Sequence, residues 1–433
     1  MAEKFDVIVV GAGMAGNAAA YTLAKAGVNV LQIERGEYAG SKNVQGGILY
    51  AQAVEALIPE FRESAPLERH IIEQRIWVLN DKSYIGTHFR SDNFNEERPN
   101  RYTLVRAQFD KWLNGEVKKA GATVITETTV LELLKDETGK VNGVRCDREN
   151  GEVRADCVIL CDGVNALVGS RSGVRKEINS KEVALAVKEM HFLPRDVINE
   201  RFNIQESEGV VIEILGTVTE GMLGTGFIYT NGESLSVGIG VIVSDLMKNR
   251  INPSTLLEKM KSHPSVAPLL KGSEVKEYSA HLLPEGGYDS VPELSGNGWM
   301  VCGDSAHLLN AIHREGSNMA LTSGRLAAET YLELRDKGQP INAENLKKYN
   351  QKLENSFVLK DLKKYRRMPH IMLENKQFVT MYPDLLAGAA ETLLRVDGVD
   401  KKTKEKKITK DFRSARGIFG LVGDAFKLVR AWR

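Results

Sequence analysis

Three glycines near the start of the chain, Gly11, Gly13 and Gly16, have the spacing of a turn that binds phosphate groups. They follow an apolar run at residues 5–10 and lead into an alanine-rich segment of helical character. In such a turn the first glycine allows the tight bend, the second lets a pyrophosphate approach the backbone, and the third lets helix and strand pack closely. The intervening residues Ala12, Met14 and Ala15 complete the predicted site. The start of the helix adds free N–H groups and the positive end of its dipole.

An acidic residue stands where a dinucleotide needs one. A second apolar run at residues 28–33 ends at Glu34, which Arg35 follows. A carboxylate at the tip of the second strand accepts hydrogen bonds from an adenosine ribose. A glycine pattern alone is weak evidence and can be a chance glycine-rich turn, but here strand, helix, second strand and acid follow in register. The sequence therefore predicts an adenine dinucleotide site, without choosing between FAD and NAD.

Two later segments repeat the pattern of a buried strand that ends in glycine and aspartate. Within residues 156–164 the strand ends in Asp162-Gly163, and within residues 298–307 the strand ends in Gly303-Asp304. Asp304 suits the ribityl or ribose hydroxyls of a long cofactor. A helix then opens at Gly316, Ser317 and Asn318, whose N–H groups suit the flavin edge that gains negative charge on reduction. Each Asp-Gly pair alone is more often a plain turn, but the three segments in this order favour FAD.

These segments must be positioned by a discontinuous fold. We expect an α/β plus antiparallel β protein with a Rossmann-like FAD-binding domain, a β-sheet substrate domain and a helical C-terminal region. Strand-like runs between 183 and 243 match neither nucleotide-binding half and predict a mostly antiparallel sheet. The expected FAD-binding domain comprises 1–75, 103–175 and 290–338, the sheet domain 76–102 and 176–289, and the helical region 339–433.

Composition narrows the function classes. A net charge of +1 over 433 residues argues against nucleic acid as the main partner. No apolar run approaches the roughly 20 residues that span a bilayer, and the first strand begins too early for a signal peptide. The four cysteines, Cys146, Cys157, Cys161 and Cys302, lie apart or in apolar strands, which indicates buried thiols in a reducing cytosol. We expect no metal site. An iron–sulfur cluster needs about four cysteine ligands at one place, whereas these four lie apart or within apolar strands.

The C-terminal tail is basic and amphipathic. Residues 401–433 hold 11 Lys/Arg and three Asp/Glu, a net charge of +8, which leaves about −7 on the first 400 residues. On a helical wheel one side of 417–433 is apolar and the other small or polar. The apolar side carries Ile418, Phe419, Leu421, Val422, Phe426, Leu428, Val429 and Trp432, and the other Gly420, Gly423, Asp424, Lys427 and Arg430. The pattern suits an interfacial membrane helix and, equally, a helix docked on the protein or on a partner subunit.

The order of the motifs resembles a known family. The chain contains GAGMAG…ER, VRAQFDKWL, VILCDGVN and GDSAH…REGSNMALTSGRLAAE. These segments resemble the FAD domain of aromatic hydroxylases, geranylgeranyl reductases and electron-transfer-flavoprotein:quinone oxidoreductases. The segments GSKNVQGGILY (40–50), GMLGTGFIYTNGESLSVGIGV (221–241), YSAHLLPEGGYDSVPEL (278–294) and SFVLKDLKKYRRMP (356–369) resemble the FixC-type branch of the last group.

The resemblance, which covers essentially the whole chain, implies a set of residues around non-covalent FAD. The implied set adds Lys42, Asn43 and Arg106 to the residues of the three segments above. Arg106 also has its own logic, because a guanidinium can pair phosphates or stack on adenine. The alternative is a surface arginine that starts a helix.

Two departures from the family pattern are informative. Fused quinone oxidoreductases of this group carry a cysteine-rich cluster domain, whereas FixC-type proteins obtain it from a ferredoxin-like partner, so a [4Fe–4S] cluster is expected on another chain. The segment 305–315 also differs from the expected small, glycine-containing form and places His307, His313 and Arg314 near the flavin. They either guide quinone protons or partner groups, or are satisfied structural residues.

The resemblance implies an FAD subunit of a FixABCX-like complex. It would pass electrons from the α and β subunits of electron-transfer flavoprotein to a membrane quinone, on the exergonic arm of NADH-driven bifurcation. Such chemistry requires no nucleophile–base pair, and none stands out. The quinone wall is expected around Met222, Leu223, Phe227 and Tyr229, unless these are plain core.

We expect the protein in the cytoplasm, peripherally associated with the inner face of the cell membrane. Two rival functions remain open. One is a prenyl-lipid reductase or flavin monooxygenase that acts alone, and the other is a scaffold that holds FAD while docking other subunits.

Overall fold

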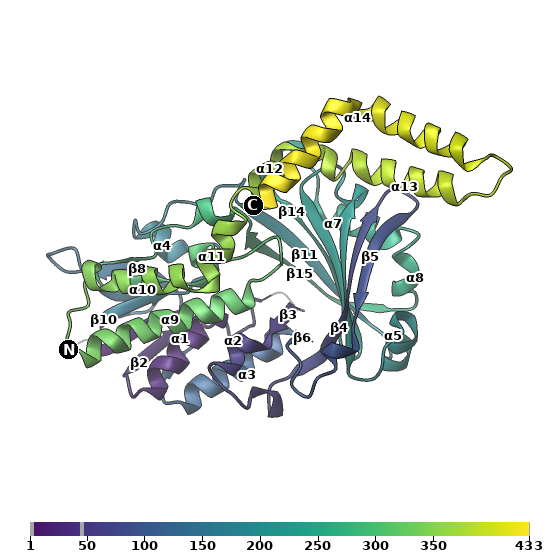
Figure 1. The fold of residues 1–433 in the computed structure, drawn as a ribbon. Coiled ribbons are helices and arrows are strands. Elements are labelled where there is room, and N and C mark those ends of the chain that lie inside the picture. The colour runs from purple at the N-terminus through teal and green to yellow at the C-terminus, as the bar shows by residue number, and fades with distance from the viewer. Residues whose placement is uncertain (1–3, 44–46, 433) are drawn as a thin grey trace. The chain divides into compact units, whose positions relative to one another are not determined.

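The computed structural model describes residues 4–43 and 47–432 of the chain (Figure 1). The described chain divides into two compact units, and each is built from three separate stretches. The first unit comprises 1–68, 98–183 and 281–363, and the second 69–97, 184–280 and 364–433. The expected separate helical region at 339–433 is thus divided between the two units.

The first unit is built on a parallel sheet. Its strand order is β16-β17-β10-β1-β2-β7, and the five strands from β17 to β7 run parallel. The strands are β1 (Lys4–Val10), β2 (Val30–Ile33), β7 (Thr123–Ile125), β10 (Glu152–Leu160), β16 (Ser295–Gly296) and β17 (Trp299–Val301). β8 (Val130–Lys135) and β9 (Val141–Cys146) extend it as an antiparallel pair beside β10. The central strands are nearly continuous apolar runs because helices cover a parallel sheet on both faces.

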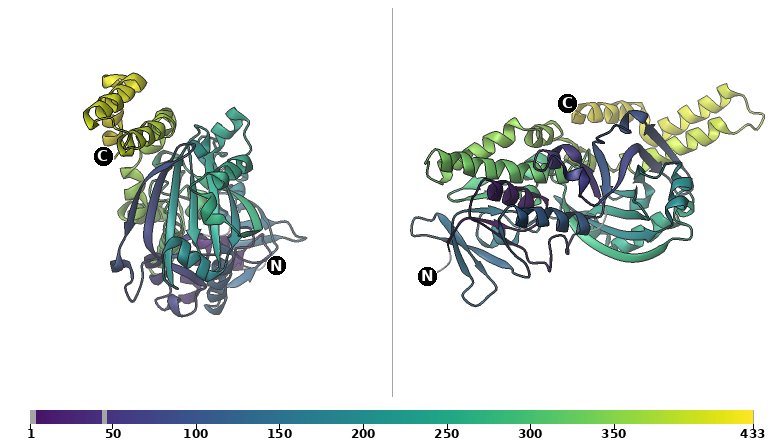
Figure 2. Two further views of the ribbon diagram at one scale, coloured as in Figure 1. Left: turned by 90° about the vertical axis from the view of Figure 1, so that its right-hand side faces the viewer. Right: turned by 90° about the horizontal axis from the view of Figure 1, so that it is seen from below.

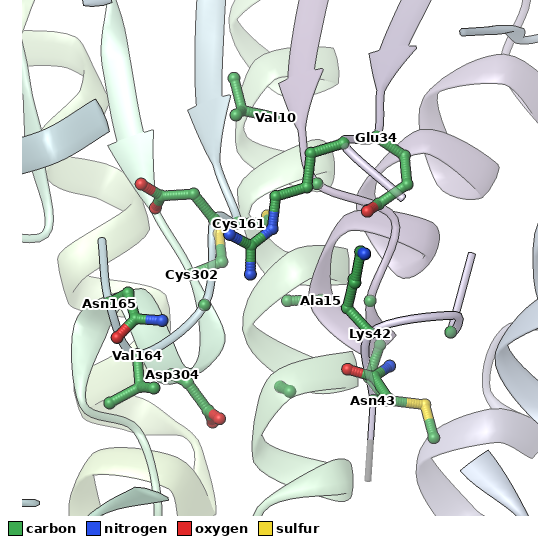
Figure 3. A pocket seen from close by; sticks show the side chains of 18 of the residues that line it. Val10, Ala15, Glu34, Lys42, Asn43, Cys161, Val164, Asn165, Cys302 and Asp304 are labelled. Atoms are coloured by element: carbon green, nitrogen blue, oxygen red, sulfur yellow. The ribbon is translucent and has the colours of Figure 1, made fainter. Parts of the chain in front are cut away.

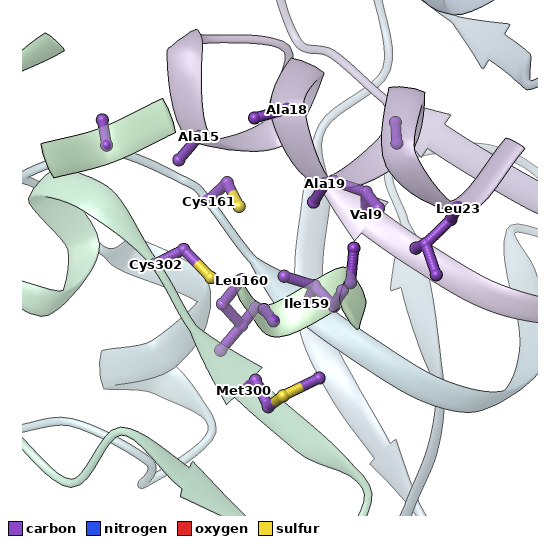
Figure 4. Packing of buried hydrophobic residues seen from close by; sticks show 14 of the residues in the cluster. Val9, Ala15, Ala18, Ala19, Leu23, Ile159, Leu160, Cys161, Met300 and Cys302 are labelled. Atoms are coloured by element: carbon purple, nitrogen blue, oxygen red, sulfur yellow. The ribbon is translucent and has the colours of Figure 1, made fainter. Parts of the chain in front are cut away.

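Small residues let the helices of this unit pack closely. α1 (Met14–Lys25) and α9 (Ser317–Asp336) touch along their length. A Cβ placed on Gly324 of α9 would lie 2.0 Å from the carbonyl oxygen of Ala15, so only glycine permits this approach. Figure 4 shows Ala15, Ala18 and Ala19 of α1 beside the apolar side chains of β1 and β10. This packing fixes the start of α1 above the strand ends.

The remaining elements of the first unit surround this core. β3 (Gly47–Tyr50) pairs antiparallel with β6 (Arg101–Leu104). The helices are α2 (Ala51–Glu55), α3 (Arg106–Lys119), α4 (Leu167–Arg171), α10 (Ala343–Asn355) and α11 (Phe357–Lys364), the last ending at the boundary of the second unit. Tyr349 of α10 is buried and donates its hydroxyl hydrogen to the carbonyl of Val301, 2.9 Å away, which ties α10 to β17.

The second unit contains a large, mostly antiparallel sheet, as the sequence predicts. Its order is β15-β11-β14-β13-β12-β4, with β5 beside β4. β11–β14, β14–β13, β13–β12 and β4–β5 pair antiparallel, and β12 and β4 pair in parallel. The strands are β4 (Leu67–Leu79), β5 (Tyr84–Arg90), β11 (Val183–Phe192), β12 (Glu208–Gly216), β13 (Gly224–Thr230), β14 (Ser234–Ile242) and β15 (Glu274–Pro284). The helices α5 (Arg195–Phe202), α6 (Val243–Asn249), α7 (Pro253–Ser262) and α8 (Ala267–Leu270) complete this part.

The C-terminal helices of the second unit form a hairpin with a kinked end. They are α12 (Met368–Glu374), α13 (Met381–Leu394) and α14 (Lys401–Trp432), and α13 and α14 lie side by side (Figure 2). α14 bends at Gly417, whose φ of 67° is not helical. Across residues 4–43 and 47–432, no helix combines the length and the apolar character required to cross a membrane.

Candidate functional site

The candidate site is a pocket at the carboxyl ends of the parallel strands of the first unit (Figure 3). Its wall includes Val10 at the end of β1, Cys161 after β10 and Cys302 after β17. Ligands of open parallel sheets bind outside the carboxyl ends of the strands. Figure 3 shows Glu34 on one side of the pocket and Asp304 on the other.

The glycines of the first turn have two different roles. A Cβ at Gly11 would lie 2.3 Å from the carbonyl oxygen of Cys161, and a Cβ at Gly16 would lie 2.0 Å from that of Gly11. The protein's own packing therefore requires these two glycines. Gly13 differs, because its φ is −78° and a Cβ there would meet no atom within 4 Å. Gly13 lines the pocket, so its missing side chain keeps space open for a ligand.

The first turn of α1 faces the pocket with its backbone. The helix begins at Met14, and no side chain of the described residues caps its first N–H groups. Met14 and Ala15 line the pocket, whereas Gly16 lies beneath them against the turn. Free N–H groups and the positive end of the helix dipole make such a site favourable for a phosphate anion.

Glu34 is held at the tip of β2 by backbone groups. Its Oε2 accepts a hydrogen bond from the N–H of Ala12 at 2.8 Å, and its Oε1 accepts one from the N–H of Gly36 at 2.7 Å. Ala12 thus positions Glu34 and is not itself among the residues that line the pocket. Arg35 and Lys42 do line it, which places two cations beside the carboxylate.

Arg106 is the first residue of α3 and is oriented by an acid one turn later. Its Nε and Nη2 donate to the two carboxylate oxygens of Asp110, each at 2.9 Å, and Asp110 is fully buried. Asn43 donates to the same carboxylate from the loop after β2. Burial alone would lower the pKa of Arg106, but its bonded partner Asp110 raises it. The structure therefore brings Arg106 and Asn43 together on Asp110, a residue that the sequence did not single out.

The second segment contributes a half-buried acid and an open backbone. Oδ2 of Asp162 accepts a hydrogen bond from the N–H of Val168 at 3.0 Å, and burial raises the pKa of this carboxyl group. Gly163 has a φ of +76°, and a Cβ there would meet no atom within 4 Å. Both residues line the pocket, where a side chain at Gly163 would be strained.

The third segment places a second half-buried acid at the pocket. Asp304 lies in a short 3₁₀ helix after β17, and burial raises its pKa to about 6, an effect that the charges of Arg106 and Arg175 partly oppose. Gly303 does not line the pocket; its φ is +62°, and its N–H donates to Ser323 Oγ at 3.0 Å. The carboxylate of Asp304 is an acceptor that suits the hydroxyl groups of a polyol chain.

The N-terminus of α9 forms a further part of the pocket wall. Gly316 and Ser317 line the pocket, and the hydroxyl of Ser317 donates to the carbonyl of Ile48 at 3.1 Å. Asn318 is buried behind them, and its Oδ1 has no hydrogen-bond partner among the described residues. The N-terminus of this long helix therefore points its free N–H groups at the pocket.

These groups fit FAD. The open space at Gly13 and the start of α1 suit a pyrophosphate, and the Glu34 carboxylate suits a ribose. Two half-buried acids, Asp162 and Asp304, and the start of α9 line the same pocket. A long cofactor with phosphates, hydroxyls and a ring that gains negative charge uses each of them.

Comparisons with known proteins identify the family. The FAD binding domain family matches residues 4–228, and the ETF-QO/FixC family C-terminal domain matches residues 368–433. Protein FixC of Azotobacter vinelandii is 59% identical over 431 residues, which covers 100% of both chains. This chain belongs to the FixC family. Protein FixC of Azorhizobium caulinodans is 58% identical over 432 residues, and that of Escherichia coli K12 is 37% identical over 98% of both chains.

Solved structures show the same fold at lower identity. A geranylgeranyl bacteriochlorophyll reductase-like protein from Thermoplasma acidophilum matches with a TM-score of 0.72 at 23% identity, covering 95% of this chain and 96% of its own. The flavin-dependent brominase Bmp2 matches with a TM-score of 0.62 at 17% identity, covering 95% of this chain and 100% of its own. The predictions of an α/β FAD fold, of FAD as cofactor and of an FAD-dependent oxidoreductase of this family are confirmed.

In this FixC-family protein, the ring of His307 contacts the guanidinium of Arg175. Its Nε2 lies within hydrogen-bond distance of the Arg175 guanidinium, and burial together with the charge of Arg175 lowers its pKa to about 4. His307 is therefore neutral at physiological pH. His307, His313 and Arg314 are not among the residues that line the pocket.

The expected quinone wall lies in the sheet of the second unit. Met222 belongs to the buried apolar cluster of that sheet, and Phe227 stacks on Tyr229 with ring centroids 4.8 Å apart. Phe227 and Tyr229 are buried and Leu223 is half-buried. The structure thus places this group in and beside the core.

All four cysteines of the chain are buried thiols. Burial raises the pKa of Cys146 and Cys161 and raises that of Cys157 to about 12, so these thiols remain protonated. Cys161 and Cys302 lie at the ends of neighbouring strands on the pocket wall (Figures 3 and 4). Among the described residues, no group of three or more His, Cys, Asp or Glu side chains forms a metal-binding cluster.

Two residues that act on pocket side chains from outside the pocket wall were not predicted. Arg175, beside Asp304, and Asp110 act through side-chain pairing that spacing does not reveal. The i, i+4 relation of Arg106 to Asp110 is the one signal that predicts such a pair. Thr128 and Asn165, from loops, and His281, from β15, also line the pocket.

Proposed function

We propose that this FixC-family oxidoreductase passes electrons from an electron-transfer flavoprotein to a membrane quinone. It would be the FAD subunit of a FixABCX-like complex in the cytoplasm, peripherally bound to the inner face of the cell membrane. The observation that carries the proposal is the full-length similarity to FixC proteins, with an FAD binding domain and an ETF-QO/FixC C-terminal domain in one chain. The same family relation supports a role for this protein on the exergonic arm of NADH-driven electron bifurcation.

We assign the following cofactor roles to the pocket residues. The glycine turn and the start of α1 hold the pyrophosphate, and Glu34 holds the adenosine ribose. Arg106, oriented by Asp110, supplies a fixed guanidinium, and Asp162 and Asp304 accept from hydroxyl groups. The N–H groups at the start of α9 stabilise negative charge at the flavin edge. Bound FAD supplies one- and two-electron transfer, while the protein binds it, orients it and tunes its potential.

The cysteines support a cluster on a separate subunit. Three of the thiols are held protonated by burial, whereas cluster ligation requires thiolates. Electrons that leave the flavin for an iron–sulfur centre therefore have to reach another chain, which the family relation suggests is ferredoxin-like.

The last part of α14 supports a place at the membrane surface. Asp424 is 2% exposed and faces the protein, where it accepts from Arg416, Tyr382 and Gln377 at 2.7–3.0 Å. Phe419, in contrast, is 94% exposed. Ile418, Val422, Phe426, Leu428, Val429 and Trp432 are exposed as well. The helix is docked through its small and polar side and presents its apolar side outward, with the basic segment 401–416 before it, as an interfacial helix does.

Purification from the native host tests the complex. We expect co-purification with electron-transfer flavoprotein and a ferredoxin-like chain, a spectrum with flavin and iron–sulfur bands, and NADH-dependent quinone reduction. A lone protein that oxidises NADPH with an organic substrate would instead indicate a prenyl-lipid reductase or a monooxygenase. A flavin that the assembled complex cannot reduce would indicate a scaffold.

Liposome flotation tests the membrane contact. We expect Phe419→Ser combined with Phe426→Ser to reduce binding to anionic liposomes by about tenfold or more, because two exposed aromatic side chains are lost. Met247→Ser is the matched control, since Met247 is also exposed but lies on α6. Unchanged flotation of the double variant, or of a chain without 417–433, would contradict the membrane role.

A further inference from the structure

Three amide side chains lie buried together behind the glycine turn. Asn17 is on α1, Gln32 on β2 and Asn114 on α3. Asn17 and Gln32 are fully buried and Asn114 is 4% exposed, at positions where apolar side chains are usual. Burying an amide costs free energy unless its hydrogen bonds are made, so this group needs a physical reason.

The three amides satisfy one another. Nδ2 of Asn114 donates to Oδ1 of Asn17 at 2.9 Å and to Oε1 of Gln32 at 2.8 Å. Nε2 of Gln32 also donates to Oδ1 of Asn17 at 3.1 Å. The orientation of each side chain is thus set by the other two. Such a network is strengthened by the low dielectric of the protein interior around it.

The network also holds the backbone of the turn. Nδ2 of Asn17 donates to the carbonyl of Ala12 at 2.9 Å, and Nε2 of Gln32 donates to the carbonyl of Gly11 at 3.2 Å. A trans peptide is planar, so its N–H points opposite to its C=O. Fixing the Ala12 carbonyl toward the network turns the N–H of Gly13 the other way, and Gly13 lines the pocket. Fixing the Gly11 carbonyl likewise aims the N–H of Ala12 at Glu34.

We infer that the Asn17–Gln32–Asn114 network sets the direction of the N–H groups of the glycine turn and thereby the affinity of this site for the pyrophosphate of FAD. The inference rests on the proposed placement of that pyrophosphate at the turn. Asn114 is a positioning residue, because within the described part of the chain its side chain donates to Asn17 and Gln32 and does not line the pocket.

The variant Asn114→Leu tests the inference, because it keeps the size of the side chain and removes both donated hydrogen bonds. In the full-length protein stripped of FAD, we expect the Kd for FAD to rise about tenfold, the order expected when one or two hydrogen bonds are lost. The Kd for ADP, which carries the pyrophosphate without the flavin, should rise by a similar factor. Hydrogen exchange of the turn at residues 11–16 should also become faster in the FAD-bound variant.

Thr330→Val is the matched control. Thr330 is also fully buried in the first unit and donates to the carbonyl of Leu326 within α9, away from the turn. It should leave both Kd values unchanged. If Asn114→Leu lowers the unfolding midpoint but keeps wild-type affinity for FAD and ADP, the network is merely structural and the inference is overturned.

A second variant and a separate readout keep the outcomes distinct. Where Asn114→Leu does not fold, Gln32→Met removes the donor to Gly11 and is judged by the same two Kd values. Gly13→Ala tests the placement of the pyrophosphate itself, independently of the network. If Gly13→Ala also binds FAD normally, the proposed placement fails; if only Gly13→Ala weakens binding, the network inference alone fails.

Discussion

Glycines that look equivalent in a motif differ in what they leave room for. Gly16 leaves room for the carbonyl oxygen of Gly11, and Gly11 for that of Cys161. Gly13 leaves room for nothing in the protein. The first two are therefore requirements of folding, and we propose that the third is a requirement of ligand binding.

This difference predicts opposite effects of two alanine substitutions. Gly13→Ala should weaken FAD binding by about tenfold or more while the FAD-free protein unfolds at its normal temperature. Gly16→Ala should instead destabilise the protein itself by about 1–3 kcal/mol, because its Cβ would overlap the Gly11 carbonyl. Calorimetry of the FAD-free proteins and fluorescence titration with FAD separate the two. A normal FAD affinity in Gly13→Ala would contradict the ligand role.

Asp304 predicts a pH dependence of stability. Burial raises its pKa from 3.8 to about 6, so the folded state binds a proton more tightly than the unfolded state. Its contribution to the free energy of unfolding is present below pH 4 and is lost as the pH rises through about 6. In the FAD-free protein, Asp304→Asn should therefore gain stability relative to wild type as the pH rises from 4 to 7, by on the order of 2–3 kcal/mol. Thermal melts across this pH range measure the difference, and a constant difference would contradict the burial of a charged group.

The sequence predicted residues whose role follows from spacing along one turn. The glycine turn, Glu34 and Asp304 are of this kind. It did not predict Asp110, Gln32 or Asn114, because each of them makes side-chain hydrogen bonds to an element that is far away in the chain. A polar residue at a buried position has no signature until its partners are known.

At the scale of elements, the kinked end of α14 depends on one buried acid. Asp424 receives two hydrogen bonds from Arg416, which lies on the other side of the bend at Gly417. Bidentate pairs of this kind are among the stronger side-chain interactions. The direction in which the apolar side faces therefore follows from this anchor.

Asp424→Asn should release this helix without unfolding the rest of the protein. The loss of a buried charge pair costs about 1–3 kcal/mol, which is large for one terminal helix. Residues 418–432 should exchange amide hydrogens faster and become sensitive to protease. Asp411→Asn is the control, since Asp411 pairs with Lys407 on the exposed part of the same helix. Equal exchange in both variants would show that Asp424 is not the anchor.

The sequence also predicted some features of the helices and strands and not others. The helical wheel of 417–433 separated two sides correctly but could not tell which side packs, because both interfacial and docked helices are amphipathic. The apolar run over 123–134 could be read as one strand, but it forms two, β7 and β8, because the chain turns between them at Glu127, whose φ is +51°. A left-handed residue other than glycine leaves little trace in the sequence. β4 begins at Leu67, before the expected start of the sheet domain at 76.

At the scale of the whole molecule, the chain passes back and forth between two units. Discontinuity of the FAD-binding region was predictable, because its three motifs are far apart. The division of the C-terminal helices between the two units was not predictable. It depends on contacts such as the hydrogen bond from Tyr349 of α10 to β17, which no sequence pattern indicates.

FAD should therefore stabilise the two units unequally. Ligand at 100 times its Kd adds about 2.7 kcal/mol to the stability of whatever it binds. We expect added FAD to slow hydrogen exchange in the glycine turn and at the start of α9, and to leave α13 and α14 unchanged. Hydrogen exchange with and without FAD measures this directly. Protection of α13 and α14 by FAD would contradict a cofactor site confined to the first unit.

The anchor at Asp424 also has a kinetic meaning. Many short amphipathic segments are disordered in water and lose conformational entropy when they fold against a surface. Here the ordering has already taken place during folding, because Arg416, Tyr382 and Gln377 hold the helix in position. A surface that meets this helix encounters a rigid apolar face, so its capture should proceed without a change in helix content and at a rate set by collision.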